Sequence, residues 1–305
     1  MRGPGGRAPL LPPGAAIPCG IALPVLLAGL LGPWSVQWVC AVGIIVVLGV
    51  PHGALDVEIG RTLLRRRWGR AWFPAFATPY LALVAGVLVA WQGVPEATLA
   101  GFLALSVWHF GTEESEGGGL PALVRGGLPI ALPVLLHPDA TARVLSAATG
   151  LAWTVPPPWL AWASLLWLPL AAAWVALAIR DGDVRRLALP LALSLCFWAL
   201  PPLVAFARYG VVGPAPAQTA ALIRHPTRVP RVHDGASAWW RALPTTLLTV
   251  LIGAALWPVH QGDPAVRLVG LTLQLLAALT LPHMLLEAWL TRTDRIAAWK
   301  PTAAG

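Results

Sequence analysis

The stretch WFPAFATPYLALVAGVLVAW, residues 72–91, runs for twenty residues without a charged side chain and decides the fold class. A helix needs about 20 mostly apolar residues to cross the hydrocarbon core of a bilayer. The stretch follows RTLLRRRWGR (Arg61–Arg70), an arginine cluster of the kind that marks cytoplasmic loops between membrane spans. We therefore predict a membrane-spanning helix at 72–91 that begins at the cytoplasmic side.

The composition extends this prediction to the whole chain. Of the 305 residues, 57% are hydrophobic and only 11% are charged, whereas roughly a quarter of the residues in a soluble domain are charged. Only helices and closed barrels span a bilayer. The apolar runs are continuous and rich in Leu, Ala and Val, without the alternation of barrel strands. We predict an all-α fold, a polytopic integral membrane bundle of helices.

We expect eight to ten transmembrane helices in a single domain that covers residues 17–290. A flexible N-terminal tail (1–16) and a cytoplasmic C-terminal tail (291–305) are expected to flank it. Residues 137–158 are expected to form a loop or a partly inserted helix, and the seventh and eighth spans admit another division. The candidate spans are 17–32, 35–51, 72–91, 96–112, 121–136, 159–179, 187–206, 207–223, 238–258 and 265–289.

The formal net charge of +8 fits a membrane topology better than nucleic-acid binding. The arginines lie between the apolar runs, and in the ten-span arrangement most of them fall on one side, which the positive-inside rule makes cytoplasmic. We expect a multi-pass protein of the cell membrane with both termini in the cytoplasm. In this arrangement His52, His109 and His283 lie toward the cytoplasmic ends of parallel helices and converge on one site.

Three histidines next to or within apolar runs each have an acidic residue four positions later. Ionisable residues at membrane depth mark function by default, and a metal-bound histidine usually donates its second ring N–H to a carboxylate or carbonyl. We predict a metal site with these histidines as ligands and the acids as their hydrogen-bond partners. The alternative is that the histidines cap helix ends and the acids face water. The pairs are His52 with Asp56, His109 with Glu113 (and its neighbour Glu114), and His283 with Glu287.

Three motifs in order, GVPHGALD (49–56), WHFGTEE (108–114) and LTLPHM (279–284), resemble the signature of the Brp/Blh family of bacterial and archaeal β-carotene 15,15′-dioxygenases. The resemblance runs from the second expected span to the last. It implies an Fe(2+) enzyme that cleaves the central double bond of β-carotene with O₂ and releases two retinal molecules. It also implies that His52 and His109 are catalytic metal ligands, with His283 as the candidate third.

The implied substrate is a long hydrocarbon that dissolves in lipid, so we expect a tunnel that opens sideways to the bilayer. Aromatic and other apolar side chains next to the histidines are the candidates for its walls. Trp108 and Phe110 flank His109, and Met284 follows His283.

One part of the family pattern is replaced in this chain. In the family, a histidine pair of the HSxxH type follows a PPLLAF…Y stretch. Here PPLVAFARY (201–209) retains that stretch, but the paired positions hold Pro214 and Gln218. Two alternatives to the dioxygenase therefore stay open. One is an inactive relative that binds carotenoid or retinal, or a rhodopsin partner, and the other is a membrane transporter, whose polar residues near the midplane would mark a substrate path.

Overall fold

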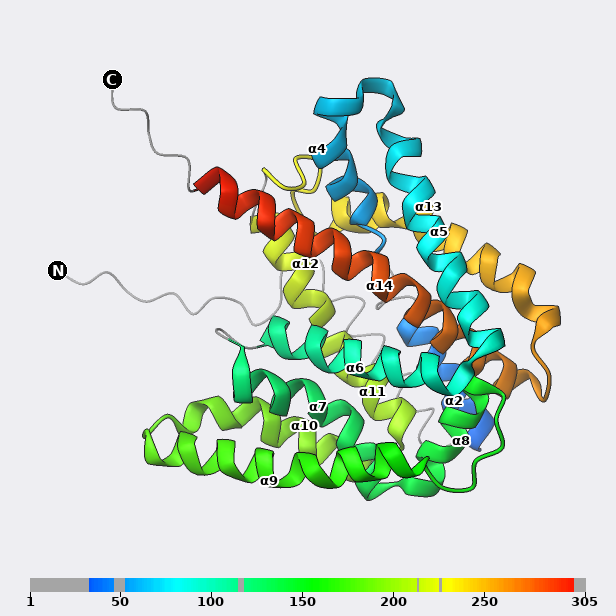
Figure 1. Ribbon diagram of the computed structural model, residues 1–305, viewed down its shortest axis with the longest axis vertical. Helices are drawn as coiled ribbons and strands as arrows, with labels where there is room; N and C mark the ends of the chain where they lie inside the picture. Colours follow the sequence, from blue (N-terminus) through cyan, green and yellow to red (C-terminus); the bar gives the residue numbers. More distant parts are fainter. Residues whose placement is uncertain (1–32, 47–52, 115–117, 213, 225–226, 299–305) are drawn as a thin grey trace.

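The computed structural model describes residues 33–46, 53–114, 118–212, 214–224 and 227–298, except for the side chains of 113–114, 211–218 and 294–298. The described chain folds into helices and contains no β-strand (Figure 1). The α-helices are α2 (Trp34–Ile44), α4 (Asp56–Trp68), α5 (Trp72–Gly93), α6 (Pro95–Glu114), α7 (Gly119–Leu136), α8 (Pro138–Thr149), α9 (Pro158–Arg180), α10 (Ala188–Ala199), α11 (Pro202–Val212), α12 (Pro214–Arg224), α13 (Gly235–Leu256) and α14 (Pro264–Ala298).

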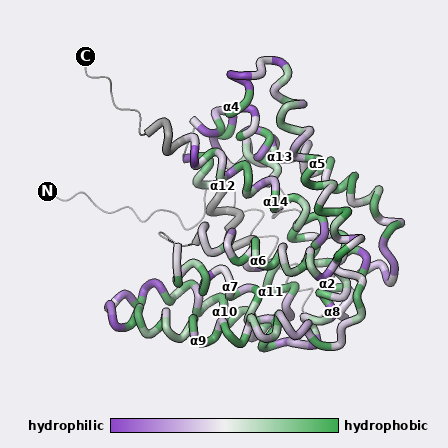
Figure 2. Tube along the Cα trace, viewed as in Figure 1, coloured by the Kyte–Doolittle hydropathy of each residue, from purple (hydrophilic) through white to green (hydrophobic). Residues whose placement is uncertain are grey.

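Five helical segments of the described chain are long and apolar enough to cross a membrane. They are Asp56–Gly93, Gly119–Leu136, Pro158–Arg180, Gly235–Val259 and Pro264–Thr293. Hydrophobic residues cover most of these helices, and hydrophilic residues gather near their ends (Figure 2). The all-α fold with several membrane-length helices is therefore confirmed, whereas the expected count of eight to ten spans is not.

Two prolines divide one expected span in two. The segment 187–206 forms α10 and the first part of α11, with a break at Leu200 and Pro201. Proline lacks a backbone N–H and clashes with the preceding helical turn, so a Pro-Pro pair ends a helix readily. The expected span 207–223 is divided likewise between α11 and α12.

The remaining expectations are met to different degrees. Residues 137–158 contain α8, which lies among the other helices (Figure 1). The span expected at 96–112 forms α6, but α6 is not among the five segments above. The span 17–32 lies outside the described residues, and 35–51 is described only to residue 46. Helix α14 continues to Ala298, beyond residue 290.

Glycines allow the backbones of α6 and α7 to touch. A Cβ added at Gly126 of α7 would collide with the carbonyl of Val107 on α6, and one added at Gly111 would collide with the carbonyl of Ala122. Small residues at such crossings are a usual means of packing helices in lipid, where apolar burial drives association weakly. The contact matters for the site described below, because α6 carries His109.

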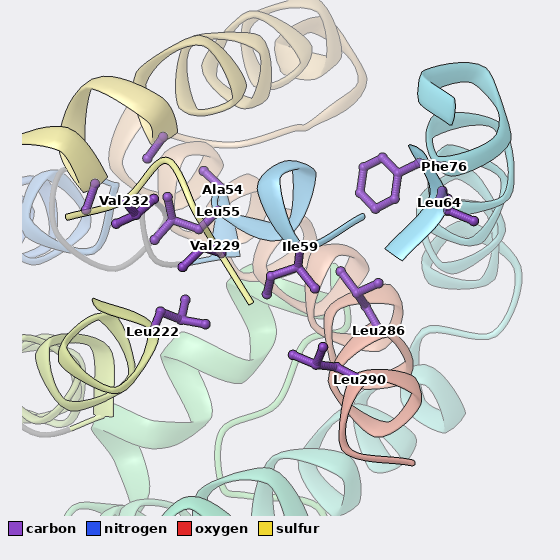
Figure 3. Packing of buried hydrophobic residues seen from close by; sticks show 12 residues of the cluster. Ala54, Leu55, Ile59, Leu64, Phe76, Leu222, Val229, Val232, Leu286 and Leu290 are labelled. Carbon is purple, nitrogen blue, oxygen red and sulfur yellow. The ribbon is translucent and has the colours of Figure 1, made fainter. Parts of the chain in front are cut away.

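The start of α4 is fixed by a buried hydrophobic cluster (Figure 3). Leu55 and Ile59 are each 1% exposed and pack with side chains from α12, α14 and the 229–232 loop. On the other side, Gly60 lies against the ring of Phe76 on α5 and leaves no room for a side chain. This packing holds Asp56, the first residue of α4, in a defined position.

We expect Gly126→Leu to destabilise the protein by more than the roughly 1–3 kcal/mol typical of overpacking, because the clash is with backbone and not with a movable side chain. Unfolding in mixed micelles measures the change. Gly86→Leu is the matched control, since a Cβ at Gly86 meets nothing within 4 Å. Equal losses in the two variants would contradict the close α6–α7 contact.

Candidate functional site

Asp56, the first residue of α4, forms hydrogen bonds to two other helices, α14 and α5. Its Oδ1 accepts a hydrogen bond from Nδ1 of His283 on α14 at 2.8 Å, and its Oδ2 accepts one from the hydroxyl of Tyr80 on α5 at 2.9 Å. Asp56 is 2% exposed and His283 is 6% exposed. Because a carboxylate only accepts hydrogen bonds, the contact places a proton on Nδ1 of His283. In a neutral ring, Nε2 is then the nitrogen with the lone pair that binds metals.

The contact differs from the pairing that the sequence spacing predicts. The expected partner of Asp56 was His52, which lies outside the described residues, so that pairing stays a prediction. The described partners of Asp56 are His283 and Tyr80. Glu287, expected to pair with His283, has its Oε2 at 3.8 Å from Nε2, which is too long for a hydrogen bond. The side chains of Glu113 and Glu114 are not among those described.

Two of the three expected histidines meet. The ring centroids of His109 and His283 lie 5.6 Å apart with planes at 86°. A metal at about 2.1 Å from a ring nitrogen lies roughly 3 Å from that ring's centroid, so two rings sharing one ion have centroids within roughly 6 Å. The pair satisfies this condition. Among the described residues, no three His, Cys, Asp or Glu side chains form a complete metal cluster.

Both histidines lie in the wall of a cavity of about 520 Å³, a volume within the usual range of ligand pockets. The wall also contains Asp56, Tyr80 and Phe110, and is otherwise mostly apolar. Helices α4, α5, α6, α11, α13 and α14 contribute to it.

Of the three expected substrate-binding residues, Phe110 alone lines this cavity. Trp108 is 61% exposed, because residues two positions apart on a helix point in different directions. Met284 is half-buried and is not among the lining residues. Pro214 and Gln218 belong to α12, but their side chains are not described.

Sequence reasoning missed both tyrosines. The chain has two tyrosines against 17 tryptophans, and both line the cavity. Tyr80 binds Asp56, and Tyr209 packs edge-on against Phe110 with ring centroids 5.4 Å apart. A buried tyrosine hydroxyl needs a hydrogen-bond partner. In a chain this poor in tyrosine, the two that are present were therefore candidates for polar contacts within the protein.

Sequence reasoning also missed a charged pair in the cavity wall. Oε1 of Glu58 on α4 lies 3.9 Å from Nη1 of Arg241 on α13. Glu58 is buried and Arg241 is partly exposed, so the pair adds charge to an otherwise apolar lining.

The fold and the site together define a class: helical proteins of membrane type with a buried histidine–carboxylate centre on an apolar cavity. Within that class, the chain belongs to the beta-carotene 15,15'-dioxygenase family, whose sequence model matches residues 43–291. The resemblance drawn from the three motifs is thereby confirmed.

Two curated relatives carry the family name. The chain is 26% identical over 317 residues to the probable beta-carotene 15,15'-dioxygenase Blh of Halobacterium salinarum, with 90% of each chain covered. It is 27% identical over 192 residues to the beta-carotene 15,15'-dioxygenase of an uncultured marine bacterium, over 59% of this chain and 66% of the relative. No solved structure matches the chain significantly.

We expect Tyr80→Phe to lower the free energy of unfolding by about 1.5–3 kcal/mol, the usual effect of losing a hydrogen bond to a charged group. Denaturation in micelles measures the loss. The control is Thr98→Val, which removes an exposed hydroxyl bonded to the Val94 carbonyl and should change stability by less than about 0.5 kcal/mol. If Tyr80→Phe were as stable as the wild type, the contact with Asp56 would not hold in the membrane protein.

Proposed function

We propose that the protein is a membrane enzyme that cleaves β-carotene at its central double bond with O₂ and releases two retinal molecules. One observation supports this proposal above the others: His109 and His283 meet in the wall of a large apolar cavity in a chain of the beta-carotene 15,15'-dioxygenase family. An imidazole pair supplies donors for a metal, and the apolar cavity suits a hydrocarbon.

The proposed cofactor is Fe(2+), for which imidazole and carboxylate ligands are suitable donors. In this chain His52 and His109 are the expected ligands and His283 is the candidate third, and of these His109 and His283 lie together in the described residues. When bound, iron supplies the activation of O₂ that a hydrocarbon and a ground-state oxygen molecule require. The double bond breaks and each of its carbons takes one oxygen atom, so one O₂ balances two aldehydes without a separate reductant.

The residues around the pair have distinct tasks in this proposal. Asp56 fixes the tautomer of His283 and the direction of its ring, which is the role of a carboxylate behind a metal-binding imidazole. Tyr80 occupies the second oxygen of Asp56 and so prevents the carboxylate from turning. The apolar wall excludes water and aligns the polyene beside the imidazoles.

The proposed route for the substrate lies between α5 and α13. Both helices pack against α14, but across the described residues they make at most marginal contact with each other. Phe73 of α5 and Trp240 and Leu248 of α13 line the cavity and are also half or more exposed. A polyene dissolved in the bilayer would enter here.

The proposed orientation in the membrane follows the arginines. The exposed arginines of α4 face the cytoplasm, together with both chain termini, in a protein of eight to ten spans.

The replaced histidine pair favours a second candidate function. With Pro214 and Gln218 at positions where the family pattern has histidine, the chain has fewer imidazole donors. The second candidate is a non-catalytic protein that retains a carotenoid or retinal in the same cavity, for example beside a rhodopsin partner. It predicts bound carotenoid and iron far below one per chain after purification.

Expression in a bacterium that makes β-carotene tests the proposed reaction. We expect loss of carotene and formation of retinal, and we expect His109→Ala and His283→Ala to abolish both, because each removes a metal donor. His233→Ala is the matched control, since that ring is exposed and lies outside the cavity. Unchanged carotene with abundant folded protein and sufficient iron would refute the enzymatic proposal.

Metal titration of purified protein tests the role of Asp56. Asp56→Asn should weaken iron affinity by about 10–100-fold, the usual effect of removing the carboxylate behind a ligating histidine. Asp139→Asn, at an exposed position in the first turn of α8, serves as the control. If both variants bound iron as tightly as the wild type, Asp56 would have no part in holding a metal.

A further inference from the structure

A second, smaller cavity adjoins the first along α6. Its volume is about 110 Å³, and α5, α6, α7, α8, α9, α11 and α14 contribute to its walls. Four residues line both cavities and form a shared partition, which is made of Phe102, Ser106, Phe110 and Phe206. Phe110 follows His109 in sequence, and their ring centroids lie 5.7 Å apart. The second cavity is therefore one ring away from the proposed metal site.

The polar groups in the walls of the second cavity are nearly all used. The Ser106 hydroxyl donates to the Phe102 carbonyl at 2.8 Å, and the Thr141 hydroxyl donates to the Pro133 carbonyl at 2.8 Å. The indole N–H of Trp91 has no hydrogen-bond partner among the described residues. A buried water needs two to four polar partners, so these mostly apolar walls favour a small apolar molecule over water.

The size of the cavity decides what it can take. It is too small for half of a carotenoid, a chain of twenty carbons with a terminal ring. A dry apolar cavity of about 150 Å³ in another protein takes up xenon or benzene. Dioxygen is smaller, uncharged and more soluble in hydrocarbon than in water, so it suits walls of this kind. It is also the second reactant of the proposed reaction.

We propose that this second cavity is a binding site for dioxygen, which reaches the histidines past Phe110 and Phe206. The two rings have centroids 6.4 Å apart, and each lines both cavities. The site would supply O₂ while the polyene occupies the larger cavity. This inference rests on the proposed function only for its kinetic consequence, because gas binding is measurable without turnover.

Ile130→Phe and Leu103→Phe fill the second cavity from two helices, and neither residue lines the first. Leu166→Phe on the exposed face of α9 is the matched control. Saturation-transfer NMR of dissolved ¹²⁹Xe, with the full chain in micelles, measures occupancy. We expect less bound xenon in each filled variant that keeps a wild-type thermal transition than in the wild type and in Leu166→Phe, because filling removes the second cavity and leaves the larger one intact. Equal xenon binding in the filled variants and the wild type would contradict the proposal. A wild type without bound xenon would overturn the proposal, whether or not the protein forms retinal.

Steady-state kinetics separate dioxygen supply from carotenoid binding. We expect the filled variants to raise the KM for O₂ by about threefold or more, with kcat at saturating O₂ and the KM for β-carotene little changed. A rise in the KM for carotene instead would make the second cavity an extension of the polyene tunnel and would overturn the proposal. So would an unchanged KM for O₂ in variants whose xenon binding is reduced.

Discussion

The hydrogen bond between Asp56 and His283 joins the first residue of α4 to the middle of α14, 227 positions away in the sequence. Two ionisable groups buried this far would each be strongly unfavourable alone, because a mostly apolar surrounding leaves a charge unpaired. Together with Tyr80 they satisfy one another. The proposed chemistry depends on this contact, since it sets which nitrogen of His283 carries the proton and which keeps a lone pair. The packing around Leu55, Ile59 and Gly60 holds the contact in place.

Helix α6 contacts both the histidine site and α7, through different faces. One face presents His109 to His283 and to the large cavity. The other packs tightly on α7 through Gly111 and Gly126. A backbone contact of this kind leaves α6 little freedom to shift, so the distance between the two imidazoles does not depend on flexible loops. Phe102, Ser106 and Phe110 of α6 border both cavities. The arrangement therefore places His109 and His283 in the wall of the large cavity, with the small cavity adjoining it.

Much of this arrangement follows from the sequence, and the failures have physical causes. Charge-free runs such as 72–91 predict membrane-length helices, because hydropathy and length suffice for that inference. The break at Pro201 was missed because prolines are tolerated inside membrane helices, as at Pro282 within α14. The convergence of His109 and His283 was expected from helix direction. The partner of His283 was not, since spacing along one helix cannot reveal a carboxylate that arrives from another helix. Trp108 was misplaced for a related reason: adjacency in sequence does not give a shared face.

The central claim is that one iron ion is held by the imidazoles of His109 and His283. X-ray absorption at the iron edge of the loaded protein tests it most directly, because imidazole ligands give a characteristic multiple-scattering pattern that oxygen ligands lack. The account predicts at least two imidazoles on iron in the wild type and one fewer in His283→Ala. Iron surrounded by oxygen alone, or a spectrum unchanged by that substitution, would contradict it.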